Sequence, residues 1–149
     1  MRKSLKRSWP LLSIVLPTLF LACGDSTPPP GNSATGNYTA TSFVTTGTSG
    51  QRNEIQAGST LVLNLNPNGT TSGHLHIAAS TGSPALDADM VGTWTQAGTT
   101  VNIDQSADTF VRDMPFEFGP DIAGGWLLDG DQGFSGTRVQ ITLKRSPSF

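Results

Sequence analysis

The sequence predicts an all-β fold, an eight-stranded antiparallel up-and-down β-barrel. Two observations predict it. From Asn37 onward the chain forms short runs rich in Thr, Val, Ile and aromatic residues, separated by Gly, Pro, Asn and Asp. Within the runs apolar and polar residues alternate, which is typical of strands with one buried face. Those apolar faces must meet, so the sheet either closes on itself or packs on a second sheet.

The runs predict eight strands. In chain order these are Asn37–Thr46, Thr60–Asn66, Gly73–Ala79, Asp89–Gln96, Thr100–Gln105, Thr109–Phe118, Ile122–Leu128 and Gly136–Arg145. The last is the clearest, because Val139, Ile141 and Leu143 share one face. Residues 47–58 are either a helical turn or an extended arm, and 80–87 is predicted to be a loop.

The short connections favour a closed barrel, which also leaves no unpaired edge. A β-sandwich is the alternative fold. The barrel domain is predicted to span residues 37–145, followed by a short tail, 146–149. If it forms, one shared core must contain Leu63, Ile77, Trp94, Ile103 and Ile141.

Three short motifs resemble pieces of lipocalin-like (calycin) barrels. They are Gly36-Asn37-Tyr38 on the first strand, Gly92-Thr93-Trp94 in mid-chain, and Arg145 at the end of the last strand. In that group a Gly-x-Trp near the first strand packs against an Arg near the last, and Tyr38 holds the first-strand aromatic position here. The resemblance implies a small barrel whose mouth or interior takes an apolar ligand.

The N-terminus has the layout of a secretory signal peptide over residues 1–22: four basic residues, then an apolar run over 9–22. That run is shorter than the roughly 20 residues needed to span a bilayer. Residues 19–23, which end in Cys23, resemble the lipobox of bacterial lipoproteins, although Phe20 replaces the usual aliphatic residue. The resemblance implies cleavage before Cys23, a diacylglyceryl group on its sulfur and acylation of its new amino group. An ordinary cleaved signal leaving a free thiol is the alternative.

Residues 23–36 contain a proline triplet and almost no apolar side chain, so they are predicted to form a flexible tether. At about 3 Å per residue the tether reaches some 40 Å from the bilayer. Gly24 follows the cysteine, whereas in the resembling lipoproteins an aspartate there retains the protein in the inner membrane. We therefore expect a lipid-anchored envelope protein, in an outer membrane facing the periplasm or cell surface rather than in an inner membrane.

Without the signal peptide the chain has five basic and eleven acidic residues, a net charge of −6. A domain this acidic, with no basic cluster, is poorly suited to nucleic acid or to an anionic lipid surface. The single cysteine is assigned to the lipid, so no disulfide framework is expected. The sequence therefore predicts a fold held together by its own apolar core.

Strict alternation over Thr109–Phe118 places Arg112 on the same face as Phe110 and Phe116. A buried guanidinium needs a partner, and in the resembling barrels an inward arginine meets a ligand carboxylate. The alternatives are pairing with Asp104 or Asp108, or exposure of Arg112 because Pro115 bends the strand. The predicted ligand-binding set is Arg112, Trp94, Phe110, Phe116 and Trp126, although the aromatic residues can equally be plain core.

His74 and His76 point to the same side of one strand and are weak candidates for a metal site. A third ligand would have to come from Asp87 or Asp89, so surface histidines are the preferred interpretation, and no metal or cofactor is predicted. The aspartates of the C-terminal third are assigned to turns. No catalytic motif is present, and we expect a protein that is not an enzyme.

Two functions remain open. The first is binding of a small apolar or amphipathic molecule inside the barrel, and the second is a protein-interaction or inhibitor module with a filled interior. An aromatic-lined cavity of roughly 300 Å³ or more would favour the first.

Overall fold

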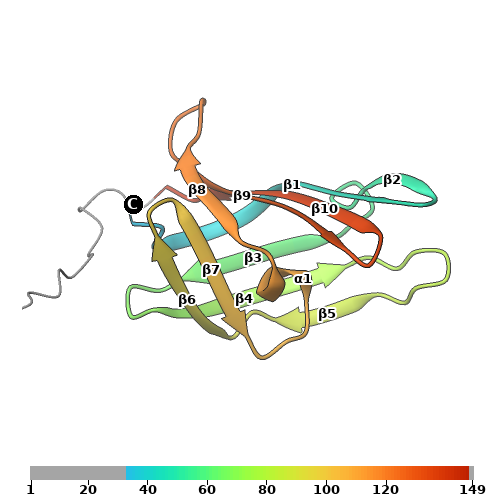
Figure 1. Ribbon diagram of the computed structural model, residues 1–149, viewed down its shortest axis with the longest axis horizontal. Coiled ribbons are helices and arrows are strands. Elements are labelled where there is room, and N and C mark those ends of the chain that lie inside the picture. The colour runs from blue at the N-terminus through green and yellow to red at the C-terminus, as the bar shows by residue number, and fades with distance from the viewer. Residues whose placement is uncertain (1–32, 148–149) are drawn as a thin grey trace, which may run out of the picture.

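The computed structural model describes residues 33–147, so the predicted signal peptide, Cys23 and most of the tether lie outside the described residues. The elements are β1 (Gly36–Gly47), β2 (Gly50–Asn53), β3 (Thr60–Leu65), β4 (Thr70–Ile77), β5 (Leu86–Asp89), β6 (Gly92–Ala97), β7 (Thr100–Gln105), α1 (Phe110–Asp113), β8 (Phe116–Pro120), β9 (Trp126–Phe134) and β10 (Thr137–Arg145) (Figure 1). No described helix is long and apolar enough to cross a membrane.

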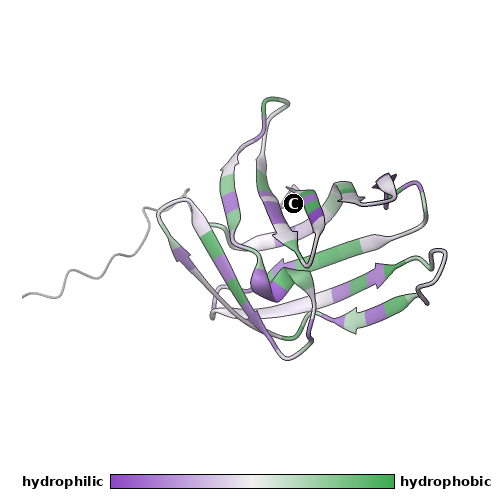
Figure 2. Cartoon of the chain, turned by 45° about the vertical axis from the view of Figure 1, so that its right-hand side comes forward, coloured by the Kyte–Doolittle hydropathy of each residue, from purple (hydrophilic) through white to green (hydrophobic). Residues whose placement is uncertain are grey.

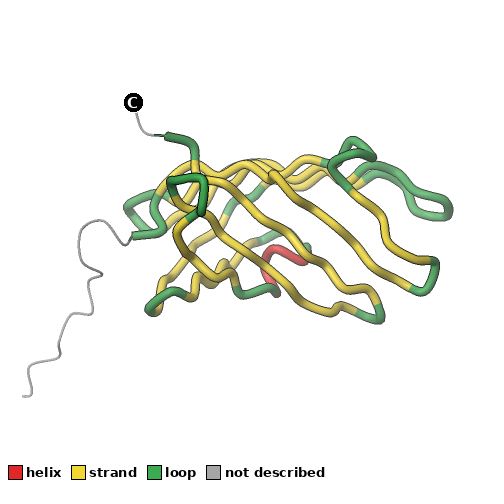
Figure 3. The backbone as a smooth tube through the Cα atoms, turned by 90° about the horizontal axis from the view of Figure 1, so that it is seen from above, coloured by secondary structure: helices red, strands yellow, loops and turns green. Residues whose placement is uncertain are grey.

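Eight of the strands close into an antiparallel barrel, which confirms the predicted fold class. Around the ring the order is β1, β3, β4, β6, β7, β8, β9 and β10, and β10 pairs back with β1. Neighbours in the ring follow one another along the chain, as in an up-and-down barrel. Figure 3 shows the turns gathered at the two ends of the strands. The closed ring leaves no place for the sandwich alternative.

The inward side chains form one core, and the alternation that predicted it is visible along the strands in Figure 2. Leu63, Ile103 and Ile141 are almost completely buried in that core, while Ile77 and Trp94 pack against it partly exposed. The largest side chains with under 2% exposure include Tyr38, Phe43, Phe116, Leu61, Leu75, Met90, Met114 and Leu128. The expectation of a common interior is therefore confirmed.

The predicted strand at Thr109–Phe118 is wrong in its first half. Residues 110–113 form the single helical turn α1, and β8 begins only at Phe116. Apolar side chains at Phe110, Val111 and Met114 fit a helical turn as well as a strand, and the packing decides between them. Pro115 disfavours helical backbone at the residue before it, so the turn ends at Met114.

The helix α1 fills the space where β7 and β8 diverge. These strands pair at only two positions, Thr100 with Glu117 and Val101 with Phe116. Val111 and Met114 are buried there, and the Phe110 ring lies 5.3 Å from the ring of Phe43 on β1. The inserted turn therefore completes the core without a further strand.

The predicted strand at Ile122–Leu128 is shifted: β9 runs from Trp126 to Phe134, and Ile122 lies fully exposed in the preceding turn. The sequence Asp129-Gly130-Asp131 predicts a turn, yet it lies in mid-strand. A Cβ on Gly130 would lie 2.1 Å from the Sδ of Met114, so the glycine makes room for the core.

Two short strands were not predicted. β2 lies within the ambiguous segment 47–58 and pairs only with β1, and β5 begins inside the predicted loop 80–87 and pairs only with β4. β6 then pairs with the other end of β4, so β5 and β6 act as one interrupted strand. At Gly73 on β4 a Cβ would lie 2.0 Å from the Val62 carbonyl oxygen, so only glycine allows this close approach.

Candidate functional site

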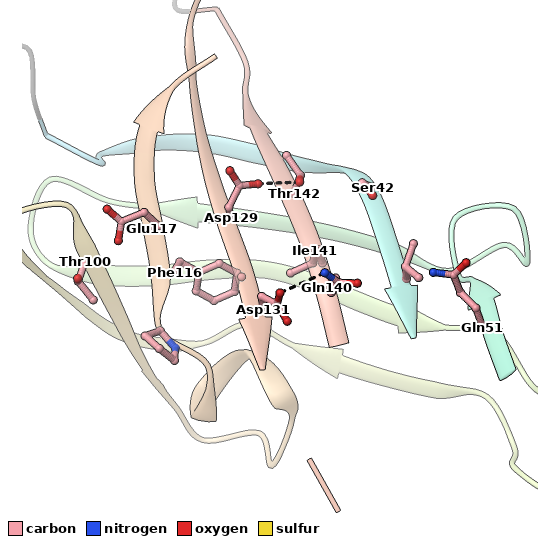
Figure 4. A pocket seen from close by; sticks show the side chains of 13 residues that line it. Ser42, Gln51, Thr100, Phe116, Glu117, Asp129, Asp131, Gln140, Ile141 and Thr142 are labelled. Carbon is pink, nitrogen blue, oxygen red and sulfur yellow. Dashed lines mark hydrogen bonds between the residues drawn. The ribbon is translucent and has the colours of Figure 1, made fainter. Parts of the chain in front are cut away.

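A large groove lies on the outside of the barrel, across β1, β2, β7, β8, β9 and β10 (Figure 4). Its volume is about 710 Å³. The lining is mostly polar: Ser42, Gln51, Thr100, Glu117, Asp129, Asp131, Gln140 and Thr142, together with Val44, Pro115, Phe116, Gly130 and Ile141. We call this the outer groove.

One row of polar residues crosses five strands in the outer groove. Thr100 pairs with Glu117, Glu117 with Asp129, Asp129 with Thr142, and Thr142 with Ser42. Residues directly opposite in antiparallel strands point to the same face, with Cβ atoms about 5 Å apart. The register therefore builds a continuous polar strip on the outer face.

The carboxylates in the outer groove are unequally compensated. Arg138 holds Asp131 with two hydrogen bonds, of 2.7 Å from Nε and 2.5 Å from Nη2, and the guanidinium lowers the pKa of Asp131. Asp129 accepts only the Thr142 hydroxyl, at 2.7 Å, and Glu117 has no polar partner among the described residues. Glu117 and Asp129 thus stand opposite each other without a cation, an arrangement that destabilises a sheet.

The sequence prediction misses this strip because it assigns Asp129 and Asp131 to a turn and relates Glu117, which it places in a strand, to no residue on a neighbouring strand. Glu117, Asp129 and Asp131 all lie within strands. A signal was present in the alternation itself: Glu117 lies between Phe116 and Phe118, and both phenylalanines are buried. An outward carboxylate follows directly from that pattern.

A second cluster joins the start of β1 to the end of β10. Arg145 pairs with Tyr38 in register, and its Nη1 donates to the carbonyls of Ser33 (3.1 Å) and Thr35 (3.2 Å). A Cβ on Gly36 would lie 2.5 Å from the Arg145 Cδ. These contacts place the Gly-x-Tyr motif against the basic residue of the last strand, as the lipocalin-like resemblance implies.

Aromatic rings complete this cluster, which we call the tether-end cluster because it lies where the predicted tether meets the barrel. The Arg145 guanidinium lies 5.8 Å from the ring centroid of Phe118 and 5.6 Å from that of Trp126, and these two rings stack at 4.8 Å. Tyr38 donates its hydroxyl to the Ala34 carbonyl at 2.7 Å. Burial raises the pKa of Tyr38 to about 12, against the opposing effect of the nearby Arg145 charge. The Arg145 guanidinium and the Tyr38 hydroxyl both have hydrogen-bond partners. We therefore interpret this cluster as a structural closure, that is, a set of contacts that joins the first strand to the last.

The predicted ligand-binding residues do not form one site. Arg112 does not share a face with Phe116, because α1 turns it outward, where it pairs with Asp108 at 2.5 Å and Asp113 at 3.0 Å. Pairing with Asp108 was one of the alternatives. Phe116 is buried beneath the outer groove, Phe110 packs in the core, and Trp126 belongs to the tether-end cluster.

Trp94 lines a smaller groove of about 310 Å³ near the start of β1. Its other lining residues are Ser33, Thr35, Pro67, Gly69, Thr95 and Gln96. The indole Nε1 donates to the Asn66 carbonyl at 2.9 Å, which fixes the ring beside the turn between β3 and β4. This groove combines one aromatic wall with polar rims.

His74 and His76 lie on the outer face, as predicted. β5 brings both candidate partners beside them: Asp87 Oδ1 lies 3.1 Å from His74 Nε2 and 2.8 Å from His76 Nδ1, and Asp89 Oδ1 lies 3.2 Å from His74 Nδ1. Hydrogen bonding to Asp87, then to Asp89, raises the pKa of His74. Within residues 33–147 no group of three or more His, Cys, Asp or Glu residues is arranged to hold a metal ion.

The chain matches no family model, and no curated protein or solved structure is significantly similar to it.

Proposed function

We propose that this chain is a lipid-anchored protein of a bacterial cell envelope that acts without catalysis, by binding a partner protein in the outer groove. The anchor rests on the lipobox-like sequence ending in Cys23, and the tether on the proline-containing segment that follows it. The barrel then serves as a rigid support for one binding face.

The observation that carries the binding role is the uncompensated pair formed by Glu117 and Asp129. Like charges directly opposite in a sheet are unfavourable, and a cation from outside relieves their repulsion. The groove around them accommodates several side chains, and its apolar lining includes Val44 and Pro115. The fitting occupant is a segment of an envelope protein that carries lysine or arginine.

The packing of the barrel interior supports an outside site over an inside one for a protein segment. Every strand of the ring except β6 contributes buried, bulky apolar side chains to one core, and Trp94 of β6 packs against that core. A small barrel can be filled in this way by its own side chains. This is the arrangement expected of the interaction-module hypothesis.

Binding of a small amphipathic molecule is a second candidate, favoured by the 310 Å³ groove beside Trp94. Trp94 fluorescence reports on it directly in a Trp126→Phe variant that lacks the signal peptide, because the only other tryptophan, Trp9, is removed with that peptide. Saturable quenching of Trp94 by a fatty acid would favour this candidate, and unchanged fluorescence would count against it.

The groove is tested by fluorescence anisotropy with a labelled ten-residue peptide rich in lysine and arginine, using residues 24–149. We expect saturable binding that weakens with salt, and an affinity about tenfold lower in Glu117→Gln/Asp129→Asn, since two partly screened charge contacts are lost. Asp104→Asn, an exposed change on β7 outside the groove, is the matched control. Equal affinity of the double variant and the wild type would refute the groove as the site.

The anchor is tested by cell fractionation. The wild type should sediment with membranes, and Cys23→Ser should be released in soluble form because the acyl chains are lost. Membrane retention of the Cys23→Ser protein would contradict lipid anchoring at this residue.

A further inference from the structure

Gln105 is a buried polar residue that the outer groove does not use. It ends β7, is 4% exposed, and neither its Oε1 nor its Nε2 has a hydrogen-bond partner among the described residues. The two inward residues before it on the same strand, Val101 and Ile103, are apolar core. An amide therefore occupies a position where the pattern of the strand calls for a third apolar side chain.

A second buried group without a partner lies across from it. Thr71 on β4 is also 4% exposed, and its hydroxyl has no partner among the described residues. Gly92 on β6 is paired with Gln105 on one side and with Thr71 on the other. Directly opposite residues share a face, so both side chains point into the barrel, on either side of a residue that has no side chain.

The spacing fits a bridged pair rather than a direct one. Two strand spacings separate the Cα atoms of Gln105 and Thr71 by about 10 Å. The Gln105 amide offers one acceptor and two donors, and the Thr71 hydroxyl offers both kinds of group. A molecule between them therefore needs a donor and an acceptor of its own.

Leaving such groups unpaired is costly, because each buried polar group without a partner destabilises a fold. Other buried polar groups of this chain are satisfied: Glu54 accepts hydrogen bonds from Thr45 at 2.7 Å and from Ser59 at 3.1 Å. A third residue with a buried polar group that lacks a partner is Thr109, whose hydroxyl lies four residues after Gln105 at the start of α1.

We propose that Gln105 and Thr71 form an internal binding site for a small uncharged hydrogen-bonding molecule, either water or a small organic compound bearing a hydroxyl or amide. An uncharged occupant is required because both side chains are neutral and the surrounding core is apolar. The site is separate from the outer groove, and its existence does not depend on the function proposed for that groove.

A double-mutant cycle tests the bridge. Gln105→Leu replaces the amide with an apolar side chain that is one atom shorter, and Thr71→Val removes the hydroxyl and keeps the shape. With an occupant, Gln105→Leu should raise the unfolding equilibrium constant about tenfold, and the two changes should be coupled although the side chains do not touch. The control pair Gln105→Leu with Thr93→Val, an exposed position on β6, should be additive. A neutral or stabilising Gln105→Leu, with no coupling to Thr71→Val, would overturn the proposal.

Two measurements on the wild type keep the test independent of how the variants fold. Nuclear Overhauser effects from the Gln105 side-chain amide to a slowly exchanging water, with a native mass equal to that of the chain alone, identify water as the occupant. An added mass that is lost from Gln105→Leu identifies an organic compound. An amide with no contact to water or to any added molecule rejects the site.

Discussion

The tether-end cluster and the Gln105 site are both partly polar regions of the barrel wall, and they treat their hydrogen-bonding groups in opposite ways. Arg145 and Tyr38 satisfy theirs with backbone carbonyls of residues 33–35, whereas Gln105 and Thr71 have no partner within the described residues. The first region is complete in itself and serves stability. The second has unused hydrogen-bonding capacity, which is the property expected of a place that holds something else.

The largest expected effect in this comparison comes from removing the aromatic ring at the complete end. Tyr38→Ala empties a fully buried position and should lower the free energy of unfolding by about 3–5 kcal/mol. Tyr38→Phe removes only the hydrogen bond to Ala34 and should cost about 1 kcal/mol. Urea denaturation measures both, and equal losses in the two variants would mean that the hydroxyl, not the ring, carries the contribution.

Arg145→Met should have the next largest effect. It keeps an apolar stem but leaves the carbonyls of Ser33 and Thr35 without their donor and removes the cation from the two rings, at a cost of about 2 kcal/mol. Arg145→Lys should lie between the wild type and Arg145→Met, because an ammonium cannot stack as a planar guanidinium does. If both variants unfold at the same urea concentration as the wild type, the cluster is not a structural closure.

The smallest effect is a titration. Tyr38 is the only tyrosine, so the ultraviolet absorbance of tyrosinate reports on it alone. Its pKa is raised to about 12 in the folded protein, so the burial of neutral Tyr38 stabilises the fold fully below pH 10 and is lost as the pH rises toward 12. Arg145→Met should raise this pKa further, because the cation favours the phenolate. Ionisation near pH 10 in a still folded protein would show that the ring is accessible to water.

The ring of strands could be predicted from the sequence, whereas most of the candidate sites could not. The alternation of apolar and polar residues in Thr100–Gln105 and in the last strand was enough to predict these strands, because one buried face fixes which residues point inward. The helical turn at Phe110–Asp113 could not be found this way, since its apolar spacing suits both structures and only the gap between β7 and β8 selects one.

The sites depend on relations across strands, which no local pattern contains. Asp129 becomes a neighbour of Glu117 only through the register of β8 with β9. A glycine between two aspartates predicts a turn when only the local sequence is considered. Gly130 lies in a strand instead, because the sulfur of Met114 occupies the space that a side chain would need. Similarly, Gln105 and Thr71 lie more than thirty positions apart in the chain and meet on either side of Gly92.

The position of β1 has a mechanical consequence. Its first residues are paired on both sides: Gly36 to Thr39 pair with β3, and the residues from Tyr38 onward pair with β10. Arg145 also donates a hydrogen bond to the carbonyl of Ser33, just before the strand. If the chain is pulled from a membrane through residues 23–35, the load enters along the axis of a strand flanked by two antiparallel ladders. Such a load must shear many hydrogen bonds at once instead of peeling them one by one, so a barrel anchored in the proposed way should withstand this load.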